Sequence, residues 1–213
     1  MILVFLGPPG AGKGTQAKVL GDRFGYRQIS TGDILRQNRA NKTPLGEEAQ
    51  SYMDAGKLVP DDLIIRMVEP ELGTGGKVIF DGFPRTIPQA EALDALLASK
   101  GFPSTAIVFD VDYKVLTDRI AGRWSNPRTG RVYHATFNPP RTPGIDDDDG
   151  GELTQRPDDR AEVVAARLAE YDEKTKPVIA WYEKHDTTIH VDGLGEIDAV
   201  SKAILTALPG VAV

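Results

Sequence analysis

The stretch Gly7-Pro8-Pro9-Gly10-Ala11-Gly12-Lys13-Gly14-Thr15 carries the spacing Gly-x4-Gly-Lys. It follows an apolar run over residues 2–6 and opens an amphipathic stretch that reaches residue 24. Glycines let the backbone fold closely enough for successive N–H groups to point at phosphate oxygens, and a following helix adds the positive end of its dipole. Lys13 supplies a full positive charge. The stretch predicts a phosphate-binding loop between a buried strand and a helix.

The residue after the lysine departs from the usual form of this loop. A serine or threonine normally stands there and binds Mg²⁺, whereas this chain has Gly14 followed by Thr15. A second acidic element, Asp81, ends the apolar run Val78-Ile79-Phe80. We expect Mg²⁺ to be held mainly by phosphates and water, with no direct protein ligand and with Asp81 near the ion through water.

Apolar segments alternate with amphipathic ones along most of the chain, which predicts an α/β fold with a parallel sheet covered on both faces. The expected strands are residues 2–6, 27–29, 77–81, 106–111 and 188–191. The expected helices are residues 13–24, 34–41, 47–55, 61–72 (capped by Asp61), 88–99, a segment ending near 121, 160–184 (kinked at Pro177) and 197–208. Ligands of such sheets bind beyond the carboxyl ends of the strands.

Residues 122–159 interrupt this alternation, because they hold five prolines, five glycines and the acidic run Asp146 to Asp149 without a helical period. We expect an inserted subdomain there, irregular or β in structure, on the surface.

Composition excludes several classes of function. With 25 Lys and Arg against 31 Asp and Glu, the net charge of −6 argues against a nucleic-acid partner. The absence of cysteine excludes disulfides, iron–sulfur clusters and Cys-zinc sites. No apolar run approaches the roughly 18 residues of a membrane-spanning helix, and the first residues do not have the pattern of a signal peptide. We therefore expect a cytoplasmic protein with no membrane partner, and a monomer by default.

Three further stretches identify a family. They are Ser30-Thr31-Gly32-Asp33 with Arg36, Asp81-Gly82-Phe83-Pro84-Arg85-Thr86 with Gln89, and Gly130-Arg131-Val132-Tyr133-His134 with Phe137-Asn138-Pro139-Pro140. Together with the phosphate loop they resemble the adenylate kinases, in the long-lid bacterial form, over essentially the whole chain.

The resemblance implies the reaction ATP + AMP ⇌ 2 ADP with Mg²⁺, and a P-loop NTPase-type three-layer fold with a five-stranded parallel sheet. It also implies three parts: a CORE formed by residues 1–29, 60–121 and 160–213, a helical AMP-binding arm at 30–59 and a small β lid at 122–159. Two alternatives remain at this point: a UMP/CMP-type kinase, and a nucleotide-dependent switch without turnover.

The resemblance also assigns roles to residues at matching positions. The catalytic cations are Lys13, Arg85, Arg123, Arg156 and Arg167. The ATP-binding residues are Gly10, Ala11, Gly12, Lys13, Gly14, Thr15, Arg119, Arg123, Val132, Tyr133 and Gly195. The AMP-binding residues are Thr31, Arg36, Lys57, Leu58, Val59, Gly82, Phe83, Pro84, Arg85, Gln89, Arg156 and Arg167, and the amide of Gln89 is expected to read the adenine edge. Asp158 and Asp159 are expected to link the lid to arginines.

Some long-lid members bind zinc in the lid through cysteines, which this chain lacks. The matching positions hold Asn126, Thr129, Asp146 and Asp149, which suit a hydrogen-bond network better than zinc. We expect no zinc and a lid held by that network and an apolar cluster of Val132, Tyr133 and Phe137.

Overall fold

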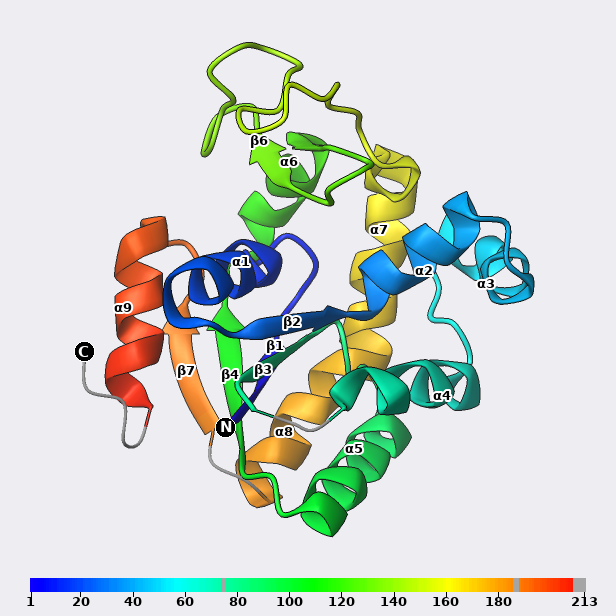
Figure 1. Cartoon of the computed structure of the whole chain (residues 1–213), viewed down its shortest axis with the longest axis vertical. Helices are drawn as coiled ribbons and strands as arrows, with labels where there is room; N and C mark the ends of the chain where they lie inside the picture. Colours follow the sequence, from blue (N-terminus) through cyan, green and yellow to red (C-terminus); the bar gives the residue numbers. More distant parts are fainter. Residues whose placement is uncertain (74–75, 186–187, 209–213) are drawn as a thin grey trace.

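The computed structural model of the chain describes residues 1–73, 76–185 and 188–208. At its centre lies a five-stranded sheet in the order β2-β3-β1-β4-β7 (Figure 1). All neighbouring strands of this sheet are parallel. The strands are β1 (Ile2–Leu6), β2 (Arg27–Ser30), β3 (Val78–Asp81), β4 (Ser104–Asp110) and β7 (Thr188–Asp192). The predicted five-stranded parallel sheet is confirmed.

Helices cover both faces of this sheet, as the alternation of segments predicted. On one face lie α1 (Lys13–Phe24) and α9 (Ile197–Ala207), and on the other α4 (Asp61–Leu72), α5 (Ile87–Lys100) and α8 (Lys176–His185). Successive side chains of a strand point to opposite faces. Val4 therefore packs in the core shared with α4, α5 and α8, while Phe5 packs in the core shared with α1 and α9.

Two groups of elements project from these three layers on the side where the parallel strands end (Figure 1). One consists of α2 (Thr31–Ala40) and α3 (Pro44–Asp54). The other carries the antiparallel pair β5 (Arg123–Ser125) and β6 (Val132–His134), preceded by η1 (Tyr113–Val115) and α6 (Leu116–Ala121) and followed by η2 (Pro157–Asp159) and α7 (Ala161–Glu170). None of the helices in the described part of the chain is long and apolar enough to cross a membrane.

Two helix starts and one helix cap differ from the sequence prediction. Helices α2 and α3 begin three residues earlier than expected, because the hydroxyls of Ser30 and Thr43 cap them by accepting hydrogen bonds from backbone N–H groups. The expected cap of α4 by Asp61 is wrong. Pro60 occupies the cap position and Asp61 is the first helical residue. Its carboxylate instead accepts hydrogen bonds from Thr86 and Gln89.

The long helix expected over residues 160–184 is interrupted, although not at Pro177 itself. Helix α7 runs into a π-helical turn, η3 (Tyr171–Thr175), and α8 then begins at Lys176, so that Pro177 lies in its first turn. Proline has no N–H to donate and its ring crowds the preceding turn. The wider π-turn before it accommodates this requirement.

Candidate active site

The phosphate loop joins β1 to α1. The structure describes no side chain that accepts a hydrogen bond as the N-terminal cap of α1. Gly12 stands at the N-cap of α1 in the left-handed region at φ 93°, and no side chain caps the helix. Gly10 has φ 83°, and a Cβ there would lie 2.9 Å from Cγ1 of Ile120. A side chain is thus disfavoured at Gly10 by both conformation and space. The N–H groups at this helix end form a site for an anion.

Lys13 begins α1 and folds back over the loop. Its Nζ donates hydrogen bonds to the carbonyl oxygens of Gly7 (2.7 Å) and Pro8 (2.8 Å). The carboxylate of Asp81, at the end of β3, lies close by, and its Oδ2 would be 3.3 Å from a Cβ at Gly14. This contact gives a physical reason for the glycine after the lysine, because a larger residue would crowd Asp81.

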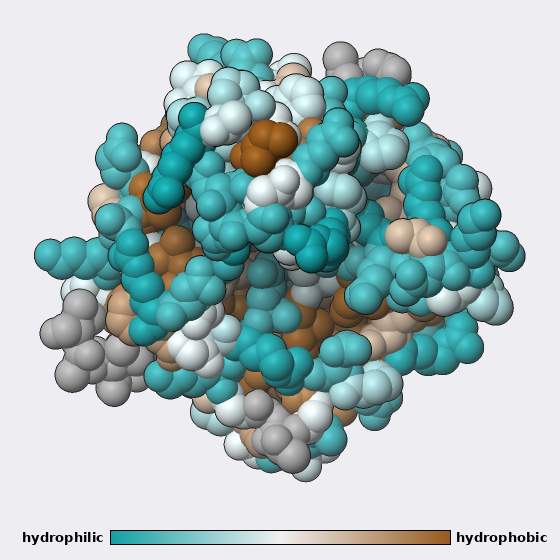
Figure 2. All heavy atoms as spheres, turned by 45° about the horizontal axis from the view of Figure 1, so that its top comes forward, coloured by the Kyte–Doolittle hydropathy of each residue, from teal (hydrophilic) through white to brown (hydrophobic). Residues whose placement is uncertain are grey.

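Arginines from distant segments converge on the same cleft. Its volume is about 1410 Å³, and it runs from the phosphate loop between the projecting groups of elements. Hydrophilic residues dominate this side of the molecule, and the surface is hollowed near its middle (Figure 2). Six of the lining arginines are those singled out from the sequence: Arg36 of α2, Arg85 after β3, Arg119 of α6, Arg123 of β5, Arg156 before η2 and Arg167 of α7.

Two neighbouring carboxylates hold part of this arginine group in place. Asp159, which is 1% exposed, accepts hydrogen bonds from Arg123 and Arg167. Asp158 pairs with Arg167 at 3.0 Å and reaches Arg36 at 4.0 Å. Burial favours the neutral form of Asp158, but the charge of Arg167, followed by other arginines, outweighs it and lowers its pKa. The predicted contact of Asp158 and Asp159 with arginines is present.

Other cations of the cleft are compensated less by carboxylates, and the ion pair of Arg156 with Asp33 is long at 3.8 Å. Lys13 and Arg85 form no ion pair within the described residues, and Arg85 instead donates from Nε to the carbonyl oxygen of Gly82 at 2.8 Å. Burial and neighbouring arginines lower the pKa of Lys13 to about 8 and that of Arg85 to about 10. Burial, with Arg36 and Arg123, also lowers the pKa of Arg156 to about 10. Such a cluster of positive charges favours a polyanion.

A smaller cavity of about 80 Å³ lies between α2, α4 and α5. Its lining includes most of the remaining residues predicted for AMP: Thr31, Lys57, Leu58, Val59, Gly82 and Gln89. Pro84 lines the large cleft. Phe83 is the exception, because its side chain is 2% exposed and packs in the core with its ring centroid 6.0 Å from that of Phe80. Its side chain therefore lines neither cavity.

The remaining residues predicted for ATP also line the large cleft. Arg119 donates from Nη1 to the carbonyl oxygen of Gly193 at 2.8 Å, and its guanidinium stands 5.1 Å from the ring centre of Phe137. Gly195 lines the cleft as well, and so do Val132 and Tyr133 of the projecting β-pair. The cleft thus brings together the whole predicted ATP set, from Gly10 to Gly195.

Comparison with known proteins agrees with this geometry. The family model described as adenylate kinase matches residues 5–187. An adenylate kinase of Methanothrix thermoacetophila is 45% identical over 212 residues, which cover 98% of both chains. Adenylate kinases of Citrifermentans bemidjiense and Clostridium tetani are 46% and 44% identical, each over 98% of this chain and over 99% and 98% of their own lengths. The chain belongs to the adenylate kinase family.

Membership of the adenylate kinase family confirms the activity that the motifs predicted. The chain is an enzyme that transfers the terminal phosphoryl group of ATP to AMP. Neither a UMP/CMP-type kinase nor a switch without turnover is favoured by these relatives. The P-loop NTPase-type fold is confirmed as well.

The oxygen atoms beside the phosphate loop fit the Mg²⁺ that the adenylate kinase family implies. Thr15 lines the cleft, and the carboxylate of Asp81 is held by a 2.9 Å hydrogen bond from the amide of Gln28. Within the described residues, no group of three or more His, Cys, Asp or Glu side chains could hold a metal ion. One carboxylate and one hydroxyl suit an ion that keeps several waters and takes phosphate oxygens.

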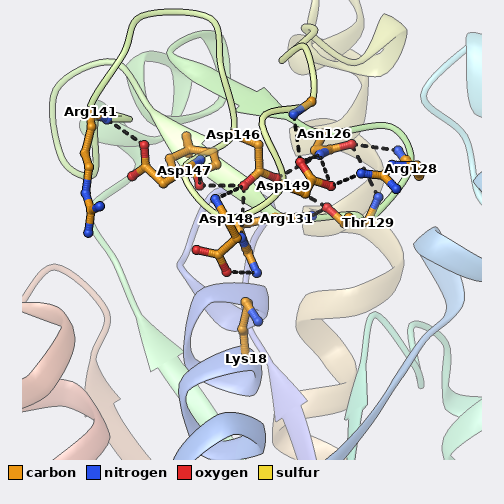
Figure 3. A network of polar contacts seen from close by, with 12 residues as sticks. Lys18, Asn126, Arg128, Thr129, Arg131, Arg141, Asp146, Asp147, Asp148 and Asp149 are labelled. Carbon is orange, nitrogen blue, oxygen red and sulfur yellow. Dashed lines mark hydrogen bonds and ion pairs between the residues drawn. The ribbon is translucent and has the colours of Figure 1, made fainter.

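The lid residues Asn126, Thr129, Asp146 and Asp149 form the expected hydrogen-bond network (Figure 3). The amide of Asn126 donates to Asp146 at 2.8 Å and to Asp149 at 2.9 Å, and Thr129 donates to Asp146 at 3.5 Å. Arg131 adds a donor that the sequence did not indicate, 2.9 Å from Asp146. These contacts tie the two halves of the lid together.

The predicted apolar cluster of the lid is partly wrong. Phe137 is 58% exposed and stacks against His134 and Arg119 rather than entering a core. Tyr133 is buried, but its hydroxyl donates to Asp146 at 2.9 Å and so belongs to the polar network. Leu153, which the sequence did not single out, is the other buried hydrophobic side chain here. A lid this small has too little apolar surface for a core and relies on polar contacts.

Replacing Asp146 should destabilise the lid. Asp146 is 1% exposed, and although burial favours its neutral form, donors from Asp148, Asn126, Tyr133 and Arg131 hold its pKa below the usual range. Asp146→Ala removes the acceptor of the Asn126 amide and the Tyr133 hydroxyl and leaves Arg131 with its surface pair to Asp148, so we expect a loss of about 3 kcal/mol in lid stability. Thermal denaturation and amide exchange of residues 122–159 measure it.

Asp148→Ala is the matched control for this lid variant, because Asp148 is exposed and pairs only at the surface with Arg131. We expect its effect on the free energy of unfolding to stay below about 1 kcal/mol.

In the unsubstituted protein a chelator should leave the melting temperature unchanged, and metal analysis should find no stoichiometric zinc. A melting temperature that falls with chelator, or equal effects of the two variants, would contradict this account of the lid.

The lowered pKa of Lys13 makes ATP binding depend on pH. Below a pH of about 8 the ammonium is charged, and as pH rises through its pKa the charge is lost. Bound phosphates favour the charged form, so we expect ATP affinity to fall above about pH 8, by at most about tenfold per pH unit, with proton uptake on binding. Titration calorimetry in buffers of different ionisation enthalpy measures both effects. ATP affinity that stays constant to about pH 9.5, or a dependence that persists in Lys13→Met, would contradict it.

Proposed function

We propose that the cleft holds ATP and AMP at once and aligns their phosphates for direct transfer. The observation that carries this is a pair of cations, Lys13 and Arg85, that lie at two different loops and form no ion pair with any residue that the structure describes. Lys13 belongs to the phosphate loop and takes the ATP β- and γ-phosphates, while Arg85 lies beside the smaller cavity and takes the AMP phosphate. Arg36 joins Arg85, and Arg123, Arg156 and Arg167 surround the group in transfer.

The chemistry needs positioning and charge compensation rather than a general base. The second pKa of a phosphate monoester is about 6, so the AMP phosphate is already an anion at neutral pH. One of its oxygens attacks the γ-phosphorus as the bond to the β,γ-bridging oxygen breaks, and the released ADP keeps that electron pair. The guanidinium groups remain charged throughout and offer paired N–H donors to the equatorial oxygens.

Mg²⁺ bound with ATP supplies further charge neutralisation at the β- and γ-phosphates. We propose that Asp81 and Thr15 face its water shell without binding it directly. The base of ATP stacks against Arg119 near Gly195, and the base of AMP lies beside Thr31 and Gln89. Backbone atoms of Lys57, Leu58 and Val59 complete the acceptor side.

We propose that residues 30–59 and 122–159 close over the CORE, formed by residues 1–29, 60–121 and 160–213, when both nucleotides bind. Closure excludes water, which would otherwise accept the phosphoryl group. The ion pairs of Asp158 and Asp159 with arginines set how the lid residues approach the remaining chain.

Distances between paired labels test this closure. Because the chain has no cysteine, two introduced cysteines at the exposed positions Glu48 and Pro143 can be labelled specifically, and a second pair at Pro143 and Lys202 reports on lid and CORE. A bisubstrate analogue that joins two adenosines through phosphates should shorten both distances. A pair at Lys100 and Lys202, both on CORE helices, serves as the control that should not change. Label distances for the first two pairs that stay unchanged with the analogue would contradict the proposal.

We also propose that the enzyme works as a cytoplasmic monomer, without nucleic-acid or membrane partners. The acidic balance and the absence of cysteine support this. Analytical ultracentrifugation at micromolar concentration, with and without nucleotide, measures the molecular mass in solution. We expect the mass of one chain.

A further inference from the structure

The side-chain amide of Gln89 is held in one orientation by two hydrogen-bond partners, one of which can only accept and the other only donate. Its Nε2 donates to Oδ1 of Asp61 at 2.7 Å, and its Oε1 accepts from the backbone N–H of Arg85 at 2.8 Å. The residue is 2% exposed. A carboxylate can only accept and a backbone N–H can only donate. Turning the amide over would therefore place oxygen against carboxylate and N–H against N–H.

Asp61 stands behind Gln89 as seen from the acceptor cavity. Gln89 lines that cavity, and Asp61 is not among the described residues that line it. Asp61 is the first residue of α4, and its second oxygen accepts from the hydroxyl of Thr86 at 2.9 Å. Thr86 in turn caps α5, the helix that carries Gln89. The carboxylate is thus fixed from both sides.

The fixed amide leaves a defined pattern for a ligand. An amide has two N–H donors and two lone pairs on oxygen, and Asp61 and Arg85 each use one of these. One donor, on the side of Nε2, and one acceptor, on the side of Oε1, remain. Adenine presents an acceptor at N1 and a donor at its 6-amino group, which complement this pattern. A 6-oxopurine presents N1–H and a 6-oxygen, which is the reverse.

We propose that Asp61 is a positioning residue that sets the preference of the acceptor site for 6-aminopurine over 6-oxopurine nucleotides, by fixing the amide orientation of Gln89. The proposal rests on the proposed function, in which Gln89 faces the acceptor base. To accept a 6-oxopurine held by the same phosphate contacts, the amide must turn over against Asp61 and the N–H of Arg85. Asp61 therefore selects without touching the nucleotide.

The test compares AMP with IMP, which differs from AMP only in carrying the 6-oxopurine pattern. For each variant, kcat/KM is measured with AMP and with IMP at saturating ATP, together with KM for ATP and the melting temperature. Asp61→Ala should lower the AMP-to-IMP ratio of kcat/KM by about tenfold, within the range for loss of a bidentate base contact. KM for ATP should change less than about twofold, because the donor site is separate.

Asp61→Asn is the matched conservative variant. Its oxygen can still accept from Gln89 while its amide donates to the hydroxyl of Thr86, which can act as acceptor. Its AMP-to-IMP ratio should stay within about threefold of the unsubstituted enzyme. Asp61→Ser also suits the first turn of a helix and removes the carboxylate, so it replaces the alanine variant if that one does not fold.

Gln89→Ala separates failure of this inference from failure of the proposed function. If Gln89→Ala lowers the ratio while Asp61→Ala and Asp61→Ser keep it, Gln89 reads the base but Asp61 does not orient it, and the inference is overturned. If Gln89→Ala keeps the ratio, the assumed role of Gln89 fails and the inference with it. Equal losses for AMP and IMP in Asp61→Ala, with an unchanged ratio, would show a merely structural role and also overturn it.

Discussion

Lys13→Ala should lower kcat by at least about 10²–10³-fold, the range found when one charge-stabilising donor is removed from an active site. The fold should remain, because within the described part of the chain the ammonium donates hydrogen bonds only to the carbonyl oxygens of Gly7 and Pro8, and Lys13 belongs to neither core cluster there. Because burial disfavours the charged form of Lys13, its removal should not lower the melting temperature. Steady-state kinetics with ATP and AMP and circular dichroism measure the two effects.

Lys202→Ala is the control for this variant, because Lys202 is an exposed lysine of α9 outside the cleft. It should keep kcat within about twofold, as expected for a surface substitution. Turnover of Lys13→Ala close to that of the control, with an unchanged circular dichroism spectrum, would refute the role of the phosphate loop.

Arg85→Ala should lower kcat/KM for AMP by about 10²–10³-fold while the dissociation constant of ATP changes less than about threefold. The asymmetry follows from its position, because Arg85 lines the acceptor cavity beside Gly82 and follows β3 rather than the phosphate loop. Binding of each nucleotide alone is measured by calorimetry, and turnover by a coupled assay.

Arg66→Ala is a suitable control for Arg85, since Arg66 is 73% exposed and pairs with Asp62 on the outside of α4. We expect no measurable change in either nucleotide's affinity. A selective loss of ATP binding in Arg85→Ala would reverse the assignment of donor and acceptor sides.

Features that depend on neighbouring residues were predictable from the sequence. The phosphate loop and the alternation of strands and helices both follow from local patterns. The arginines at family positions also reach one cleft. The early helix starts were missed because Ser30 and Thr43 cap one turn before the apolar period begins.

Contacts between distant segments were not predictable in the same way. Gln28 donates to Asp81 because β2 and β3 are neighbours in the sheet. The order of strands in a sheet cannot be predicted from the sequence of one segment. Asp61 has the residue type of a helix cap, yet its carboxylate turns to Gln89 because α4 and α5 begin side by side. Phe137 is apolar but exposed, since the lid offers it no core.

Product analysis by ³¹P NMR tests the central claim most directly, namely that this cleft transfers a phosphoryl group from ATP to AMP. The purified enzyme with Mg²⁺ and ATP is given AMP, CMP, UMP or GMP in turn, and water alone as the blank. We expect two ADP for each ATP consumed with AMP, at least about tenfold slower reaction with the other acceptors, and little inorganic phosphate in the blank. Faster transfer to CMP or UMP, or release of inorganic phosphate without ADP formation from AMP, would contradict the account.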